Sequence, residues 1–543
     1  MRKYFFIALI LMLAIFLRFF SISTNPPSLT WDEAAWGYNA YSLGTDGRDE
    51  FGKFLPLTYI ESFGDYKPPL YAYLAVIPVR IFGLNEFATR FPSAFFGVLT
   101  VLITYFLTKR IFNVSSKLEI GNWKLEILPL LAAGLLAISP WHILLSRAAF
   151  EANVATFFIV LGVFLFFSSL SNKWLLPLSV ISFIISMYTF NTARILAPLL
   201  LLVLLISQRK YLLFALKKQL FVSLILGAVF FLPLFLFLLT PQAKLRFQEV
   251  NIFTDSQVVD RANQQIANDN NAFWSKIIHN RRLGFAASFL NHYFDNFSPE
   301  FLFIKGDGNP KFSIRDVGQM YIWEIPFFIA GILLLFRKRE GYWWIIPIWL
   351  ILGIIPAATA RETPHALRIE AVLPTFQILT AYGLYHLISN FKLRPILSGL
   401  VSIVAIFNFL YFYHNYFVHY PREFSSEWQY GYKEAIGFVK NNEAKYDKVI
   451  LTEDLGRPYI YALFYTKYDP SGFRKEARIE REVYGFVHVR EFGKYKFSES
   501  VKNNIDRSKE ILYLDTPGKI PSDANILKKF KLLDGNEILV AYE

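Results

Sequence analysis

Residues 31–33 read Trp31-Asp32-Glu33 and place an acidic pair shortly beyond the first hydrophobic segment of the chain. The same loop continues to residues 65–70, which read DYKPPL, and then enters more apolar sequence. Charged residues beside a membrane span are costly to keep and usually have a function. The stretch therefore predicts an integral membrane protein whose reactive groups lie at the bilayer surface.

The composition agrees with a mostly membrane-embedded chain. Of its 543 residues, 54% are hydrophobic, against about 45–50% in a soluble globular protein. The net charge of +13 is explained by Lys and Arg in cytoplasmic loops, so nucleic-acid binding is not expected. Cysteine is absent and the eight His are scattered, which excludes disulfides and thiol nucleophiles and argues against a zinc site.

Hydropathy predicts about eleven transmembrane helices, because a span needs about 20 mostly apolar residues. The first lacks a small-residue cleavage site and is expected to be an uncleaved helix with its N-terminus in the cytoplasm. The candidate spans are 4–20, 89–108, 127–141, 150–170, 174–190, 193–207, 219–240, 319–336, 342–358, 367–388 and 395–413.

The short segment 69–84, which contains Pro78 and Arg80, decides the topology. If it does not cross, the basic loops all lie on the side of the N-terminus, as the positive-inside rule requires. We therefore interpret it as a re-entrant or juxtamembrane helix in a multi-pass protein of the plasma (inner) membrane. The basic loops are 109–124, 172–173, 208–218, 337–340 and 390–394, and the extracytoplasmic segments are 21–88, 146–151, 191–194, 241–318, 360–368 and the tail.

The tail alternates strand-like runs with helical stretches, which predicts a small extracytoplasmic α/β domain. It contains no GxGxxG, P-loop or GxSxG motif, so we expect a lid or scaffold. The predicted domains are a membrane part, 1–413, with outer loops 21–88 and 241–318, and a soluble part, 414–543. A run rich in Gln and Asn, 255–271, predicts a mobile segment that closes over substrate.

Asp32 and Glu33 begin an expected juxtamembrane helix, where acids also act as N-terminal caps. A cap accounts for one acid, but not for a pair flanked by Trp31 and Trp36, so we favour catalysis; a partly desolvated carboxylate is a better general base. Glu151 lies at the outer mouth of a span and is a second candidate. An ion pair with the residue four positions before it is an equally good explanation.

Five cations lie at or near the predicted extracytoplasmic face and would suit a phosphate or pyrophosphate group. Each one alone is more often a side chain that reaches to the membrane interface. The candidate phosphate-binding residues are Lys67, Arg90, Arg194, Arg361 and Arg368, and the candidate groove residues are Trp31, Trp36, Tyr66 and His365.

Three stretches together resemble the N-terminal signature of the GT-C membrane glycosyltransferases. They are residues 31–33, residues 67–71 (KPPLY) and residues 82–93 (FGLNEFATRFPS). The resemblance is greatest to the branch of protein O-mannosyltransferases and the aminoarabinose transferases that modify lipid A, over residues 1–210 and more loosely over 320–390. It implies a GT-C fold and inverting transfer of a sugar from a polyprenyl phosphate to an acceptor hydroxyl.

The resemblance also implies roles for individual residues. Asp32 would be the general base with Glu33 beside it, and Glu151 matches a later acid of the family. Donor phosphate binding would fall to Lys67, Arg90 and Arg368. The implied partners are a polyprenyl-phosphate-linked sugar, the bilayer, and an acceptor protein, lipid or glycan.

Two features stay open at this point. No metal is expected, as in the nearer branch, although the three acids could hold a divalent cation if they converge. A transporter or flippase for a lipid-linked saccharide is the alternative function, but internal repeats typical of transporters are not seen. A membrane-anchored binding or assembly protein would leave the acid pair and the cations unexplained.

Overall fold

The computed structural model describes residues 5–112, 117–120, 123–390, 394–482, 485, 487–506 and 508–543. The chain forms two compact units, each assembled from separate stretches. Unit 1 comprises Met1–Leu17, Phe96–Leu145 and Ala152–Phe412, and unit 2 comprises Arg18–Phe95, Ser146–Glu151 and Tyr413–Glu543. The first outer loop thus belongs to the same unit as the C-terminal domain, whereas the sequence places it in the membrane part.

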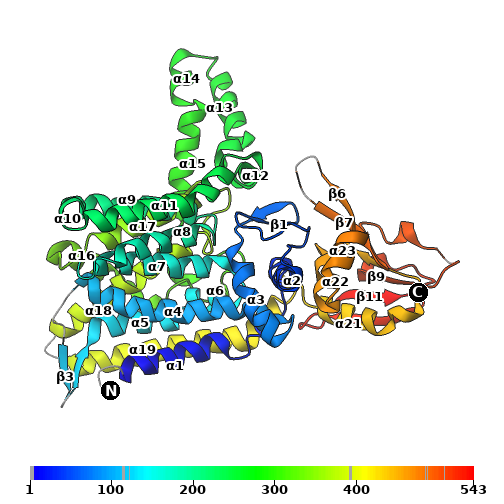
Figure 1. Ribbon diagram of the computed structural model, residues 1–543, viewed down its shortest axis with the longest axis horizontal. Coiled ribbons are helices and arrows are strands. Elements are labelled where there is room, and N and C mark those ends of the chain that lie inside the picture. The colour runs from blue at the N-terminus through cyan, green and yellow to red at the C-terminus, as the bar shows by residue number, and fades with distance from the viewer. Residues whose placement is uncertain are drawn as a thin grey trace. The chain divides into compact units, whose positions relative to one another are not determined.

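Unit 1 is a bundle of apolar helices (Figure 1). Each of the eleven predicted spans falls on one of these helices or on a bent pair of them. Some of the helices begin or end in unit 2. They are α1 (Phe5–Phe19), α4 (Glu86–Phe112), α5 (Ile127–Ile138), α6 (Pro140–Arg147), α7 (Glu151–Ser169), α8 (Leu175–Met187), α9 (Ala193–Ser207), α10 (Arg209–Ala215), α11 (Lys217–Leu238), α16 (Ile325–Lys338), α17 (Ile345–Ala358), α18 (Thr375–Asn390) and α19 (Arg394–His414).

The number of membrane crossings stays a prediction. Among the described residues, five helices are long and apolar enough to cross, or seven if the bent pairs α5–α6 and α9–α10 each form one span. Shorter apolar helices include α1, α8, α17 and α3 (Leu70–Phe82), the last of which occupies the segment read as re-entrant or juxtamembrane. Parts of two basic loops, 113–116, 121–122 and 391–393, lie outside the described residues.

Two glycines bring α16 and α18 into close contact. A Cβ atom at Gly331 would lie 2.0 Å from the Leu379 carbonyl oxygen, and one at Gly383 would lie 1.9 Å from that of Phe327. Small residues at such crossings let helix backbones approach closely. In a membrane this close packing holds helices together, because the surrounding lipid is as apolar as their side chains and no hydrophobic effect drives the helices together. Neither position therefore accommodates a side chain without moving a helix.

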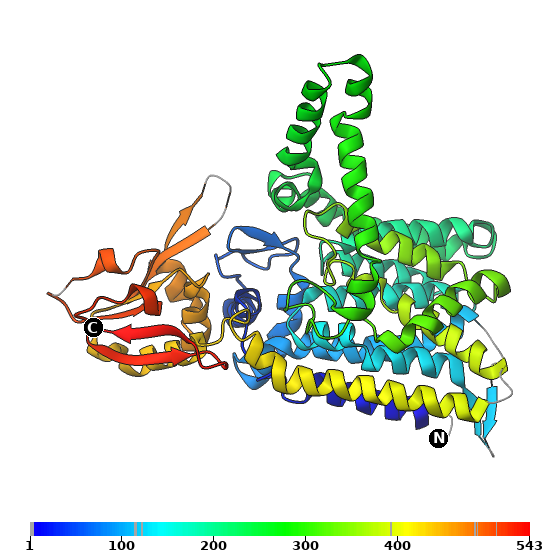
Figure 2. The ribbon, with the colours of Figure 1, turned by 180° about the vertical axis from the view of Figure 1, so that it is seen from behind.

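The outer loop 241–318 of unit 1 is largely helical. Residues 255–271, predicted to be mobile, contain a helix that Asp255 caps by accepting from the backbone N–H of Gln257. A hairpin of helices extends away from the bundle in both views (Figures 1 and 2). The helices of this loop are α12 (Pro241–Val250), α13 (Ser256–Asn268), α14 (Phe273–Ile278) and α15 (Arg281–Asp295).

Unit 2 is built on a seven-stranded mixed sheet of order β10-β11-β9-β5-β8-β7-β6. The central strand β5 is parallel to both of its neighbours, and the other pairs are antiparallel. This sheet with its helices confirms the α/β domain predicted for the tail. The elements are β5 (Lys448–Thr452), β6 (Arg478–Arg481), β7 (Val487–Phe492), β8 (Tyr495–Ser498), β9 (Ile511–Asp515), β10 (Ile526–Lys531), β11 (Glu537–Tyr542), α20 (Tyr420–Glu423), α21 (Tyr432–Asn442), α22 (Pro458–Thr466) and α23 (Pro470–Glu476).

The first outer loop packs into this domain through helix α2 (Trp31–Asp46) and the hairpin β1 (Ile60–Ser62) and β2 (Asp65–Lys67). A Cβ atom at Gly37 of α2 would lie 2.5 Å from the ring of Phe464 on α22, so a glycine is needed there. The Tyr461 hydroxyl donates to the Leu29 carbonyl over 3.1 Å. Arg474 forms an ion pair with Asp46 at the end of α2. The C-terminal domain therefore fixes the helix that begins with the acidic pair.

Candidate active site

The N-terminus of α2 turns the two acids in different directions. The Thr30 hydroxyl accepts from the Glu33 backbone N–H, and the Glu33 carboxylate accepts from the Thr30 backbone N–H, which completes a capping box. Glu33 is 1% exposed, whereas the side chain of Asp32 is 50% exposed. One acid therefore fastens the helix start, and its neighbour is open to a reactant.

Glu33 is held by Arg90 and by a backbone N–H from the stretch that precedes α7. Its Oε1 accepts from Arg90 Nε at 2.8 Å and from the Ala149 backbone N–H at 2.9 Å. Its Oε2 accepts from Arg90 Nη2 at 3.1 Å, in addition to the Thr30 contact. These donors hold the buried carboxylate in one orientation. Glu33 thus acts as a structural anchor of the site.

Arg90 uses every donor that it has within unit 2. Its Nη1 group donates to the carbonyls of Ile22 and Pro26, each at 2.8 Å, and its Nη2 group also donates to Ser28. A guanidinium offers five N–H donors, and all five are engaged once the two contacts with Glu33 are included. In this structure Arg90 therefore has no N–H group left for the predicted contact with a donor phosphate.

Lys67 is the cation that the fold places on Asp32. Its ammonium forms an ion pair with the Asp32 carboxylate, and its side chain is 11% exposed. The ammonium also lies 5.4 Å from the ring centroids of Trp36 and Phe63, in range for cation–π attraction. Burial lowers the pKa of Lys67, but the carboxylates of Asp32 and Asp65 outweigh it and raise the pKa above the ordinary lysine value. Lys67 is therefore charged and forms the positive half of the ion pair with Asp32.

Glu151, the first residue of α7, belongs to the same cluster. The Trp36 indole donates a hydrogen bond to its carboxylate, and Glu151 interacts electrostatically with both Lys67 and Asp32. The structure thus brings together three groups that are far apart in sequence: Asp32, Lys67 and Glu151. Trp36, a predicted groove residue, is buried between them and the ring of Tyr71, with 5.6 Å between the ring centroids.

The other two aromatic groove candidates of this loop pack against protein. A Cβ atom at Gly456 would lie 2.6 Å from the Trp31 ring, so this loop of the C-terminal domain sits directly on the indole. The Tyr66 ring meets Tyr59 edge-on at 4.9 Å. Both are only partly buried, so each keeps a surface that a substrate can contact.

Sequence reasoning missed the group that holds the loop before α2. Arg147, the last residue of α6, donates to the Tyr416 hydroxyl at 3.1 Å and to the Asn25 carbonyl at 2.7 Å. Its guanidinium also lies 4.9 Å from the Phe417 ring centroid. The only signal for this role in the sequence is that a charged residue, Arg147, lies at the mouth of a span. An ion pair with Glu151 explains that position equally well.

The remaining predicted residues lie in unit 1. Arg361, His365 and Arg368 share one loop, in which Arg361 donates to Asn251 and Arg368 donates to Glu362. Arg194, at the start of α9, donates to the carbonyl of Met187, the last residue of α8. The grouping of all five cations around one phosphate stays a prediction.

A buried acid that the sequence did not single out braces the 365–368 loop. The Asp307 carboxylate accepts from the backbone N–H groups of Ala366 and Asn309, at 2.7 and 2.8 Å. Burial raises the pKa of Asp307 to about 6. In the described part of the chain, no three His, Asp or Glu side chains gather as metal ligands do.

A second buried acid, Glu50, joins the first outer loop to α22. Its carboxylate accepts from the Tyr459 hydroxyl at 2.8 Å and from the Asn39 amide at 3.3 Å. Burial, reinforced by the nearby carboxylates of Asp49 and Glu61, raises the pKa of Glu50 to about 8. The folded protein therefore keeps a proton on Glu50 at neutral pH.

We expect Glu50 to make unit 2 less stable as the pH rises. The folded pKa of about 8 lies above the unfolded value of about 4.3, so the folded state binds the extra proton between these values and stability falls across that window. The measurement is the unfolding midpoint of the full chain at pH 5.5 and pH 8, for the natural protein and for Glu50→Gln. The variant should lose less stability over this range; parallel behaviour of the two would contradict the assignment.

Comparison with known proteins supports the fold and the membrane setting. Residues 8–251 match the family model for dolichyl-phosphate-mannose-protein mannosyltransferase. An uncharacterized protein of Aquifex aeolicus (strain VF5) is 30% identical over 145 residues, which is 25% of this chain. The match spans only 27% of the length of that relative.

Solved structures match over a greater length but at low identity. ArnT from Cupriavidus metallidurans has a TM-score of 0.56 at 12% identity, covering 98% of this chain and 97% of ArnT. Its undecaprenyl-phosphate complex has a TM-score of 0.53 at 12% identity, covering 99% and 98%. The Archaeoglobus fulgidus oligosaccharyltransferase tethered with an acceptor peptide has a TM-score of 0.50 at 14% identity, covering 85% of this chain and 63% of that one.

Such likeness at low identity shows a shared fold, and here it extends over nearly the whole chain. The match to the family model covers the N-terminal part of the chain, and this part contains the acidic pair, Lys67 and Glu151. Over residues 8–251 the chain is therefore similar to the protein mannosyltransferase family, and over nearly its whole length it has the fold of ArnT.

Proposed function

We propose that this protein transfers a sugar from a polyprenyl-phosphate donor to an acceptor hydroxyl on the extracytoplasmic face of the plasma membrane. The observation that carries the proposal is the half-exposed Asp32 carboxylate, paired with the buried Lys67 ammonium at the start of α2. A fold neighbour that binds undecaprenyl phosphate and another tethered with an acceptor peptide support this choice of substrates.

Asp32 is the general base in this proposal. It takes the proton of the acceptor hydroxyl while the acceptor oxygen forms a bond to the anomeric carbon. The bond from that carbon to the donor phosphate oxygen breaks on the opposite side, and the polyprenyl phosphate leaves with the electron pair. The configuration at the anomeric carbon is inverted.

Lys67 serves both halves of this step. A carboxylate in an ion pair is a weaker base than a free one, so the contact must loosen when the acceptor reaches Asp32. The released ammonium can then stabilise the negative charge that develops on the leaving phosphate, a form of electrostatic catalysis. Glu151 and Trp36 limit the positions that the ammonium can take.

The other candidates take supporting roles. Glu33 and Arg90 position the acidic turn, because their hydrogen bonds are directed at each other and at backbone groups. For the donor phosphate we retain Arg194, Arg361 and Arg368 as candidates, and His365 as a groove residue, on the basis of the sequence. The sugar can go to a protein, a lipid or a glycan.

The function can be tested in proteoliposomes that contain the full chain and a panel of polyprenyl-phosphate sugars. We expect release of polyprenyl phosphate and transfer of the sugar from at least one donor to a hydroxyl acceptor. Translocation of lipid-linked sugar across the bilayer, without transfer from any donor, would contradict the proposal and favour a transporter.

A further inference from the structure

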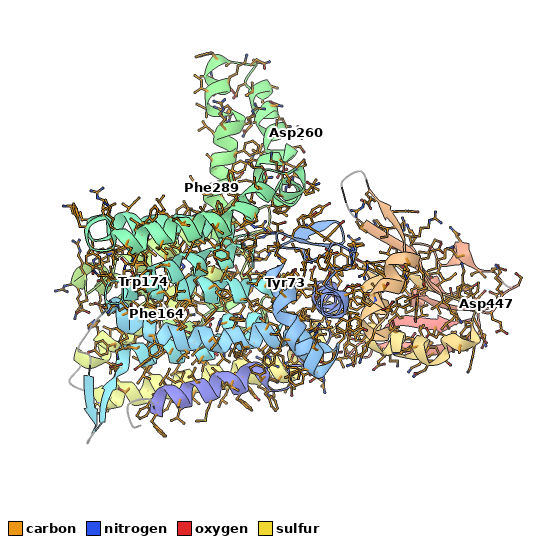
Figure 3. All side chains as sticks on the ribbon, viewed as in Figure 1. Tyr73, Phe164, Trp174, Asp260, Phe289 and Asp447 are labelled. Atoms are coloured by element: carbon orange, nitrogen blue, oxygen red, sulfur yellow. The ribbon has the colours of Figure 1, made fainter. Side chains whose placement is uncertain are left out.

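The hairpin formed by α13, α14 and α15 has two chemically different sides. Figure 3 shows Asp260 on the α13 arm and Phe289 on α15 near the base of the hairpin. Gly284 lies where the arms meet, since a Cβ atom there would be 2.9 Å from a methyl group of Val258. The sides turned away from this contact are therefore the outer faces of the hairpin.

The outer face of α15 carries an apolar stripe. Leu283, Leu290 and Phe294 are spaced by seven and four residues, which puts them on one side of a helix. They are 51%, 51% and 63% exposed. Ala286 and Ala287 lie between Leu283 and Leu290 and are also exposed. Large apolar side chains grouped in this way mark an interaction surface.

The tip of the hairpin continues the stripe and adds positive charge. Phe273 and Trp274 of α14 are 80% and 54% exposed, and Ile277 is 53% exposed. Lys276 lies among them, and Arg281 and Arg282 follow at the start of α15, all of them exposed. Aromatic rings and cations together are typical of segments at the headgroup level of a bilayer.

The outer face of α13 is polar instead. Asp260, Asn263 and Gln264 are exposed, whereas Ala262 is buried against the hairpin. A hairpin that stood free in water, or that was buried inside an assembly, would not need this division. One apolar and one polar side suit a boundary between lipid and water.

The root of the hairpin is attached where two apolar helices end. The backbone N–H of Ile252 donates to the carbonyl of Thr359, the residue after the end of α17. The His292 ring contacts the Ala360 carbonyl at 2.8 Å. The segment that leads into the hairpin, α12, follows directly after α11, a candidate span. The hairpin therefore leaves the bundle at the level at which these helices leave the apolar layer.

The apolar stripe is also continuous with the outside of the bundle. The Tyr293 hydroxyl donates to the Ile351 carbonyl of α17 at 2.9 Å, and Ile351 is itself 53% exposed. In both ribbon views α15 runs across the axes of α11 and α17 (Figures 1 and 2). A helix that runs across the axes of spanning helices lies parallel to the membrane plane.

We propose that the α13–α15 hairpin lies in the outer interface of the bilayer, with the α15 stripe and the α14 aromatic residues in lipid. Lys276, Arg281 and Arg282 would contact lipid phosphates, and the α13 face would remain in water. This surface does not depend on the sugar-transfer chemistry, because none of its residues belongs to the candidate active site.

The absence of cysteine from the chain makes a site-specific test possible. Leu290→Cys and Phe273→Cys, each labelled with a fluorescent probe, would report the lipid-facing side in proteoliposomes of the full chain. Gln264→Cys is the matched control on the polar face. Phospholipids brominated on their acyl chains should quench the first two labels at least about two-fold more strongly than the control. Aqueous iodide should show the reverse order.

Equal quenching of all three labels by iodide, with none by brominated lipid, would overturn the proposal. Labels at 273 and 290 that are shielded from both quenchers would also overturn it, because that result means that protein covers the stripe. Misfolding of a variant is detected separately by the size-exclusion profile of the labelled chain. Leu283→Cys offers a second reporter on the same stripe if Leu290→Cys does not fold.

Discussion

Replacing Asp32 by asparagine is expected to lower sugar transfer by about 10²- to 10⁴-fold, the usual contribution of a general base. The substitution keeps the shape of the side chain but removes the group that accepts the proton. Because Asp32 is half exposed and does not hold the helix start, the capping box of α2 should persist. The measurement compares turnover and donor binding of the two proteins in proteoliposomes.

Asp65→Asn is the matched control for the loss of one negative charge. Asp65 also acts on Lys67 electrostatically, but Asp32 is the carboxylate that forms its ion pair. Turnover should therefore stay within about ten-fold of the natural protein, because a screened charge at partial exposure has a small effect. Equal losses in the two variants would mean that the local charge matters rather than a base at Asp32.

Glu33→Gln should instead destabilise the protein. Removal of the charge leaves the buried Arg90 guanidinium without its carboxylate, and breaking one side of a buried ion pair typically costs about 3–5 kcal/mol. The new amide group would also face N–H donors from Arg90, Thr30 or Ala149. We expect a lower unfolding temperature and faster proteolysis of unit 2 in the detergent-solubilised full chain.

Glu61→Gln is the control for this second variant. Glu61 also forms an ion pair with an arginine in unit 2, but that partner, Arg481, is 49% exposed. Pairs of this kind contribute about 0–1 kcal/mol, so the unfolding temperature should barely change. If Glu33→Gln were as stable as Glu61→Gln, the anchoring role of Glu33 would be refuted.

The helices were predictable because hydropathy is a local property of the sequence. Spans such as 150–170 and 219–240 match α7 and α11 to within a few residues. For residues 255–271 the polar side chains predict a mobile segment, and this motion stays a prediction. In the structure Asp255 caps a helix there, and Val258 packs against the second arm of the hairpin.

The active-site candidates could be named from the sequence, but their partners could not. Glu33 and Arg90 are 57 residues apart, and Glu33 and Ala149 are 116 apart. No periodicity links such positions, since their contact depends on how the helices pack. For this reason Arg90 was expected to bind phosphate, although its five N–H groups are used within the protein. Lys67 and Asp32 were both identified, but their direct pairing was not.

The discontinuity of unit 2 has a consequence for the biosynthesis of this protein. A ribosome delivers residues 18–95 and 146–151 to the membrane long before residues 413–543, which complete the unit. Until then the loop of Gly456 cannot pack on Trp31. Glu50 also lacks its partner, the Tyr459 hydroxyl, and Arg147 lacks the Tyr416 hydroxyl. The packing around the acidic turn is thus completed only when residues 413–543 have been made, whereas the hydrogen bonds of Glu33 to Thr30, Arg90 and Ala149 can form earlier.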